Sequence, residues 1–185
     1  MKKWIKVTII VLATPVVLFL ILLGAYIIIN LQGVIEPFQV GYPDAHHKIL
    51  IASQGSEFKN TLTNEFVELL NDNTNYISIV DCTSLDNEAP ADWDAIIIIH
   101  TTQIHGMPDE ARRFLSRASD LSKIVLITTS GGGDETVTEF EIDAISTASR
   151  LSVTNQITDW AIAKLDRIFE NEIPTSGISS MEALH

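Results

Sequence analysis

The feature that most constrains this chain is an uninterrupted apolar run near its N-terminus. From Val7 to Ile29 there are 23 residues without a charge, and the next charged residue is Glu36. At about 1.5 Å per residue, a helix of this length spans roughly 34 Å, which exceeds the apolar core of a bilayer, about 30 Å thick. The run therefore predicts a single transmembrane helix. No second run of this kind occurs in the sequence, which argues against a multi-span transporter.

Two interpretations compete for residues 1–30. A cleaved signal peptide has an apolar core of about 7–15 residues before a small-x-small cleavage site, whereas this run is longer and has no such site. An uncleaved signal anchor fits better. Lys2, Lys3 and Lys6 precede the run, and no lysine or arginine follows it for 18 residues, so the N-terminus is expected in the cytoplasm. The sequence thus predicts a single-pass protein of the cell membrane with an extracytoplasmic domain.

The part of the chain after the apolar run is strongly acidic. It carries nine basic and 24 acidic residues, which gives a net charge of −15 with neutral histidines. This charge repels nucleic acid and anionic lipid headgroups, so we expect neither as a partner, whereas it would steer a basic protein toward the domain. Cys82 is the only cysteine, so an intramolecular disulfide, a dithiol redox pair and a Cys-rich zinc site are all excluded.

Hydrophobic periodicity divides the remaining chain into a tether, a domain and a tail. Residues 31–47 are rich in glycine and proline and predict a tether. Residues 48–171 alternate between short apolar runs, expected to be strands, and segments of helical periodicity, and residues 172–185 predict a flexible tail. The expected strands are 48–53, 76–81, 94–100 and 123–128, with a fifth near 143–149, and the expected helices start near residues 60, 108 and 154. Such alternation predicts βαβ units and a parallel sheet.

Glycine and small polar residues are concentrated after three of the predicted strands. The loops concerned are 53–61, 101–107 and 128–134. Ligands of parallel sheets covered by helices bind beyond the carboxyl ends of the strands. We therefore expect an anion or cofactor site where the three loops meet, although each loop taken alone is also consistent with a simple turn.

These three segments resemble the flavodoxin-like superfamily. The loop from Ser53 to Thr61 is similar to the family's phosphate loop, a Ser-rich turn that ends in Asn-Thr. The segment from Asp94 to Pro108 is similar to its third strand and flavin-edge loop, and 123–133 to its fourth strand and Gly-rich flavin loop. The resemblance covers roughly residues 48–170. It implies FMN as cofactor and an α/β, flavodoxin-like three-layer sandwich with a parallel sheet of order 2-1-3-4-5, here preceded by a single N-terminal transmembrane helix.

The resemblance also implies which residues would bind FMN. The phosphate would be held by Ser53, Ser56, Asn60 and Thr61. Apart from the resemblance, Lys59 is the one cation in this loop, and its flexible stem predicts a smaller contribution. The isoalloxazine edge would face Thr101, Thr102, Gln103 and Gly106, and its other side would face Ser130, Gly131, Gly132 and Gly133. This chain has Ile104 and His105 where family members usually stack an aromatic residue on the flavin.

A further resemblance concerns Asp143 to Ser149. It is similar to the Asp-x-x-Ser/Thr-Gly-Ala-Thr motif on which extracytoplasmic flavin transferases esterify FMN, with Thr147 in place of the glycine and Ser149 in place of the acceptor threonine. The motif implies Ser149 as a covalent attachment point for FMN. The alternative is that this segment is the fifth strand, followed by the cap of the last helix.

Two functions remain open at this point. The first is a membrane-anchored protein that binds FMN and transfers electrons outside the cytoplasmic membrane to or from a basic redox partner. The flavin would then carry the redox chemistry, and the protein would supply no catalytic acid or base. The second is a non-catalytic binding or scaffold module on a degenerate flavodoxin-like fold that has lost FMN.

Overall fold

The structure is a computed structural model that describes residues 2–30, 33–102, 106–130, 132–133 and 139–172. The chain forms two compact units, Met1–Gly33 and Val34–His185. The first unit consists of α1 (Lys2–Asn30), a continuous helix that contains Pro15.

The predicted membrane anchor is not supported by α1. Within the described residues, no helix combines the length and the apolar character required to cross a membrane. The predicted transmembrane helix is therefore wrong for the part of the chain described, and so is the cell-membrane localisation inferred from it.

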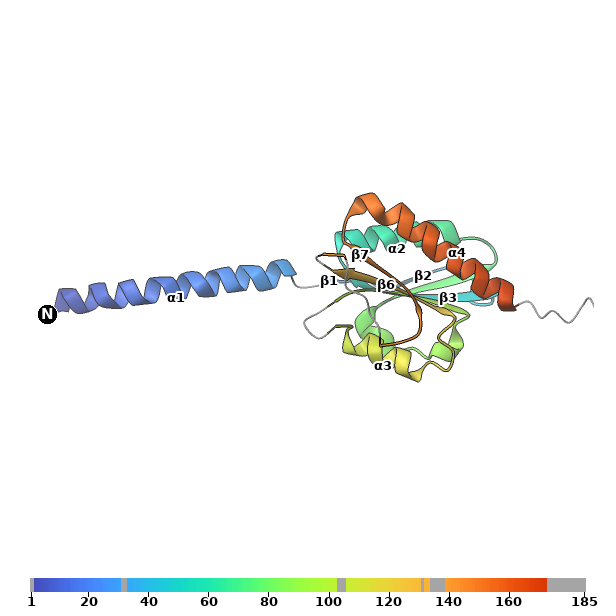
Figure 1. Ribbon diagram of the computed structural model, residues 1–185, viewed down its shortest axis with the longest axis horizontal. Coiled ribbons are helices and arrows are strands. Elements are labelled where there is room, and N and C mark those ends of the chain that lie inside the picture. Colours follow the sequence, from blue (N-terminus) through green and yellow to red (C-terminus); the bar gives the residue numbers. More distant parts are fainter. Residues whose placement is uncertain (1, 31–32, 103–105, 131, 134–138, 173–185) are drawn as a thin grey trace, which may run out of the picture. The chain divides into compact units, whose positions relative to one another are not determined.

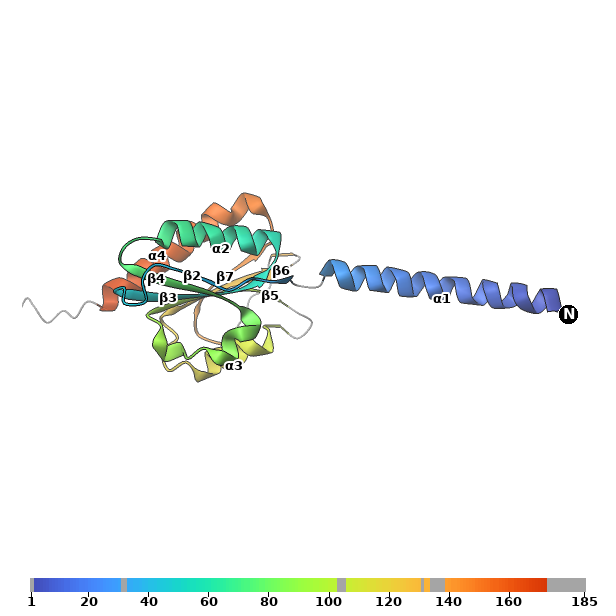
Figure 2. The same cartoon turned by 180° about the vertical axis from the view of Figure 1, so that it is seen from behind.

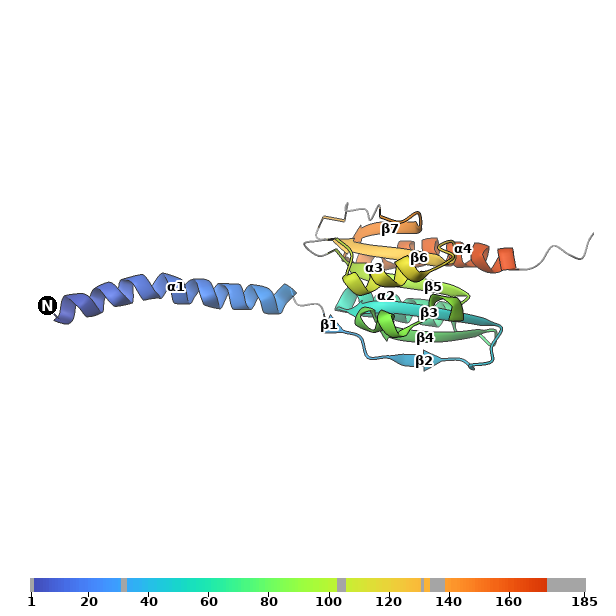
Figure 3. The ribbon, with the colours of Figure 1, turned by 90° about the horizontal axis from the view of Figure 1, so that it is seen from below.

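The second unit is built on a seven-stranded sheet, as far as the described residues show it. Its strands are β1 (Gly33–Val34), β2 (Phe38–Val40), β3 (His47–Gly55), β4 (Asn75–Asp81), β5 (Ala95–Thr101), β6 (Ile124–Ser130) and β7 (Asp143–Ala148). Their order is β2-β4-β3-β5-β6-β7, with β1 paired to β3 (Figure 3).

The five long strands of the sheet are parallel to one another. Strand β3 pairs with β4 and β5, β5 pairs with β6, and β6 pairs with β7. Numbered among themselves along the chain, these strands have the order 2-1-3-4-5, which confirms the predicted parallel core. Strand β2 runs antiparallel to β4, with Phe38 opposite Ile79. Part of the segment 31–47, expected to be a tether, thus forms an edge strand.

Helices cover both faces of this sheet (Figures 1 and 2). On one face lie α2 (Glu57–Leu70) and α4 (Thr154–Glu172), which follows the 3-10 helix η3 (Leu151–Val153). On the other face lies α3 (Asp109–Arg117), with the 3-10 helices η1 (Cys82–Asn87) and η2 (Pro90–Asp92) in the connection from β4 to β5. These layers confirm the predicted α/β three-layer sandwich of the flavodoxin-like type.

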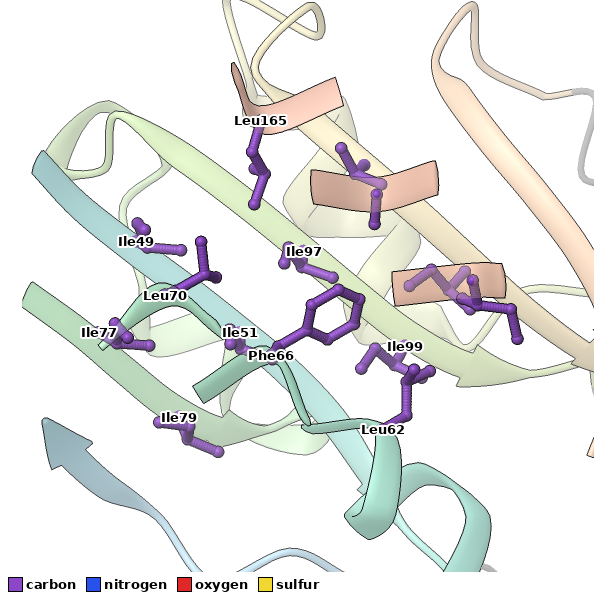
Figure 4. Close-up of a cluster of buried hydrophobic side chains, with 14 of the residues drawn as sticks. Ile49, Ile51, Leu62, Phe66, Leu70, Ile77, Ile79, Ile97, Ile99 and Leu165 are labelled. Carbon is purple, nitrogen blue, oxygen red and sulfur yellow. The ribbon is translucent and has the colours of Figure 1, made fainter. Parts of the chain in front are cut away.

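The apolar runs of the sequence form the two cores between these layers. In β5, Ile97 and Ile99 belong to the core under α2 and α4, whereas Ile96 and Ile98 belong to the core under α3. A strand that buries both faces has no polar alternation, which explains the uninterrupted isoleucine run. Figure 4 shows Phe66 of α2 among the isoleucines of the first core.

A polar contact ties α2 to α4 above the same core. The carboxylate of Glu65 accepts hydrogen bonds from Thr154 Oγ1 at 2.7 Å and from Thr158 Oγ1 at 3.0 Å. Hydrogen bonds to a charged acceptor stabilise more than neutral ones. The contact fixes the position of α2, whose first turn borders the candidate site.

Candidate ligand-binding site

The strand ends that were predicted to meet lie together at the carboxyl edge of the sheet. The backbone N–H of Thr101, at the end of β5, donates to Gln54 Oε1 of β3 at 2.8 Å. The hydroxyls of Thr101 and Thr129 are 2.8 Å apart, which links β5 to β6. The edge is therefore rich in hydroxyl and amide groups, and many of them bind one another.

The connection from β3 to α2 is much shorter than the predicted loop 53–61. Strand β3 continues to Gly55 and α2 begins at Glu57, so Ser56 alone joins them. Ser56 has an extended backbone and caps the helix, because its Oγ accepts from the backbone N–H of Lys59 at 3.3 Å. The first N–H groups of a helix have no partner within the helix, so this N-terminus is suited to an anion.

The other three predicted phosphate ligands are placed differently from what a phosphate loop requires. Ser53 is completely buried in β3, and its hydroxyl donates to Gln54 O at 3.1 Å. Asn60 lies exposed within α2, and its N–H donates to Ser56 O at 2.8 Å. The hydroxyl of Thr61 donates to Glu57 O at 2.9 Å, one turn into the helix. In the conformation described, these three residues do not fit the phosphate of FMN.

The residues predicted at the isoalloxazine edge end or follow β5. The hydroxyl of Thr101 faces Thr129, and the N–H of Thr102 donates to Thr129 O at 2.9 Å. Gly106 has a φ of +89°, which favours glycine, and an added Cβ would lie 3.7 Å from Glu139 and 3.8 Å from Arg112. Gln103 lies outside the described residues, as do Ile104 and His105.

The glycine-rich segment after β6 packs against the end of β7. The Oγ of the buried Ser130 accepts from Gly133 N at 2.8 Å. Gly133 has a φ of +82°, and an added Cβ would lie 2.5 Å from the backbone nitrogen of Ala148. This close approach requires glycine whether or not a ligand binds. Gly132 is exposed, and Gly131 lies outside the described residues.

The segment that resembles a covalent FMN attachment motif is extended. Asp143 begins β7 and forms an ion pair with Lys164, with 2.6 Å between Oδ1 and Nζ. Ser149 is exposed and follows the last residue of this strand. At about 3.3 Å per residue, the two ends of the motif are roughly 20 Å apart. Ser149 thus lies at the carboxyl edge and Asp143 at the opposite edge.

Lys59 is the residue whose role the sequence analysis underestimated. It was expected on a flexible stem in a loop, but it lies in the first turn of α2 and is only 1% exposed. Burial lowers the pKa of its amino group to about 8. The sequence contains a signal for this, because Lys59 is in phase with Leu62 and Phe66 on the buried face of the helix.

Two more buried titratable groups, the imidazole of His100 and the thiol of Cys82, lie near Lys59, and both are uncharged at neutral pH. His100 is completely buried, with Nε2 3.1 Å from Thr128 Oγ1, and burial lowers its pKa to about 4. Burial also raises the pKa of the Cys82 thiol well above its usual value. His100 is therefore neutral and Cys82 a thiol at pH 7, so the thiol is not a nucleophile. No cluster of three metal-ligating side chains occurs among the residues described.

The sequence matches no family of known proteins and none of the curated proteins. A flavodoxin of Streptococcus pneumoniae TIGR4 has 12% identity and a TM-score of 0.42, over 65% of this chain and 97% of the flavodoxin. The protein Smu.1420 of Streptococcus mutans UA159 has 15% identity and a TM-score of 0.38, over 67% of this chain and 99% of that protein. The strand order and the layers described above make this chain a flavodoxin-like α/β sandwich.

Proposed function

We propose that this chain is a non-catalytic binding module that takes a small phosphorylated ligand at the carboxyl edge of its sheet. The observation that carries the proposal is Lys59, a lysine 1% exposed at the start of α2. A buried ammonium group acts over a longer distance than an exposed one because its surroundings screen its charge less than water does, and a phosphate at the start of α2 would be attracted by this charge.

The donors for a phosphate come from the start of α2. The N–H groups of Glu57 and Phe58 belong to the first turn, and Ser56 adds a hydroxyl beside them. The helix dipole places a partial positive charge at the same point. The positive charge of Lys59 would also attract an anion at the start of α2, because its buried surroundings screen the charge less than water does. Local groups must dominate, because the net charge of the domain repels anions.

FMN-dependent electron transfer is the second candidate function. It is favoured by the parallel strand order 2-1-3-4-5 and by the polar residues at the carboxyl ends of β3, β5 and β6. It is disfavoured by the positions of Ser53, Asn60 and Thr61, which do not form the expected phosphate loop. A basic redox partner remains part of this second candidate only.

Calorimetric titration with pyrophosphate, followed by gel filtration with FMN, tests the two candidates. We expect saturable binding of pyrophosphate that weakens at least tenfold in Lys59→Met, since a hydrogen bond or charge contact to an ionised partner contributes about 1.5–3 kcal/mol. Lys48→Met is the matched control, because Lys48 is exposed at the opposite end of β3. It should bind pyrophosphate as the unmodified chain does.

Three results would contradict the proposal. Absence of pyrophosphate binding overturns it, and so does equal binding by Lys59→Met and the unmodified chain. If FMN instead co-elutes with the protein and gives its visible flavin absorbance, the second candidate replaces the first.

A further inference from the structure

A polar hollow lies at the opposite edge of the sheet from the candidate site. It has a volume of about 540 Å³ and is lined by Gly41, Tyr42, Asn71, Asp72 and Asn73. The turn after β2 contributes the first two residues, and the turn after α2 contributes the other three. Helix α2 separates the two places, and its 14 residues span roughly 20 Å.

The backbone on one side of the hollow is held close to β4. Gly41 has a φ of +86°, and an added Cβ would lie 2.2 Å from the carbonyl oxygen of Asn75. The carbonyl of Tyr42 accepts from the N–H of Ala45 at 2.9 Å, which closes a turn. The side chain of Tyr42 nevertheless remains 70% exposed. A fixed backbone thus presents an aromatic ring to the solvent instead of burying it.

The carboxylate on the other side is also held in place. Asp72 Oδ1 accepts from the N–H of Thr74 at 2.7 Å and from its hydroxyl at 2.6 Å. These hydrogen bonds from Thr74 lower the pKa of Asp72, so the group is ionised at neutral pH. The orientation of this negative charge is therefore fixed by the turn that follows α2.

Apart from the imidazole of His47, which acts on Asp72, the surroundings of the hollow favour positive charge. Helix α2 ends at Leu70, directly before the lining residues, and has no basic residue in its last turn. The C-terminus of a helix carries a partial negative charge of roughly one half. The face of a tyrosine ring also attracts cations. An anion would meet repulsion from the carboxylate, the helix end and the net charge of the domain.

We infer that this hollow binds an organic cation, an ammonium or guanidinium group, with Asp72 as its counter-charge and the ring of Tyr42 as a cation–π contact. The cation belongs to a free amine or to an exposed lysine or arginine of a basic protein. Asn71 and Asn73 supply amide oxygens that can accept hydrogen bonds from the same group. The inference does not depend on the function proposed for the carboxyl edge.

An NMR titration of the ¹⁵N-labelled chain tests this inference, with methylguanidinium as the free cation and tetra-arginine as a peptide. We expect saturable shifts of the amide signals of residues 41–42 and 71–73 that weaken as salt is added. Asp72→Asn keeps an Oδ1 acceptor for Thr74 and removes the charge, and it should weaken binding about tenfold. Tyr42→Leu should weaken it about threefold. Asp44→Asn, an exposed acid outside the lining, is the control and should leave the affinity unchanged.

The pattern of results separates the outcomes. Saturation by both probes supports a site for free amines, and saturation by tetra-arginine alone supports a site for a basic protein. The inference is overturned if neither probe saturates the signals of 41–42 and 71–73. Equal weakening by Asp72→Asn and Asp44→Asn would also overturn it, because the binding would then reflect only the net charge.

Discussion

Replacement of Lys59 by methionine should stabilise the folded chain at pH 7. The methionine side chain has a similar length and fits a buried helix face, but it carries no charge that must be removed from water. Burial lowers the pKa of Lys59 from 10.5 to about 8. One pKa unit corresponds to about 1.4 kcal/mol, so the buried charge costs roughly 3–4 kcal/mol of folding stability at pH 7.

The effect of pH on this difference has a definite sign. Below pH 8 the lysine is protonated in both states, so the full cost is present. Between pH 8 and 10.5 the folded state releases its proton while the unfolded state still holds it, so the stability of the unmodified chain rises. The advantage of Lys59→Met should therefore shrink across this range and be small above pH 10.5.

Denaturant unfolding at pH 7, 8, 9 and 10 measures these differences. Comparison with Lys48→Met removes the contribution of lysine and tyrosine groups that titrate elsewhere in the chain. A Lys59→Met chain that is less stable than the unmodified chain at pH 7 would show that the buried charge of Lys59 does not destabilise the fold. A difference that stays constant from pH 7 to 10 would do the same, because it would show that Lys59 has an ordinary pKa.

Three further predictions concern stability. The unmodified chain should lose stability as pH falls from 6.5 toward 4, because the unfolded state takes up a proton before the buried imidazole of His100 does. His100→Gln should remove this loss, and unfolding at pH 7, 6 and 5 checks it. Gly133→Ala should cost roughly 1–3 kcal/mol, since its Cβ would lie 2.5 Å from Ala148 N at a φ of +82°. Gly106→Ala, with its nearest atoms 3.7 Å away, should cost less in the same thermal unfolding assay. Glu65→Gln should cost about 1–2 kcal/mol, because it weakens two hydrogen bonds to α4; an unchanged unfolding midpoint would show that this contact does not stabilise the fold.

The parallel core could be predicted from the sequence because its strands are buried on both faces. The run Ile96 to Ile99 has no polar alternation, and only a central strand accommodates it. Strand β2 could not be predicted in this way. Residues Phe38–Val40 lie between glycines and prolines, and they become a strand only by pairing with β4, a partner far away in the sequence.

The candidate site was predicted in place but not in detail. The strand ends that meet at the carboxyl edge follow from the parallel order. The residue at which α2 starts does not follow from the strand order. Asn60 and Thr61 are both capable of capping a helix, but Ser56 is the residue that caps α2. With the helix starting at Glu57, the predicted phosphate ligands move into α2 and Lys59 moves onto its buried face. A shift of one turn therefore decides which residues face a ligand.

Phosphate binding at the start of α2 is tested by an NMR titration of the ¹⁵N-labelled chain with pyrophosphate. We expect saturable shifts of the amide signals of residues 56–59, which include the N-terminal N–H groups of α2, and at least tenfold weaker binding in Lys59→Met. Shifts that are absent, that saturate at the same pyrophosphate concentration in Lys59→Met, or that map to residues 71–73 at the other end of α2 would contradict phosphate binding at this place.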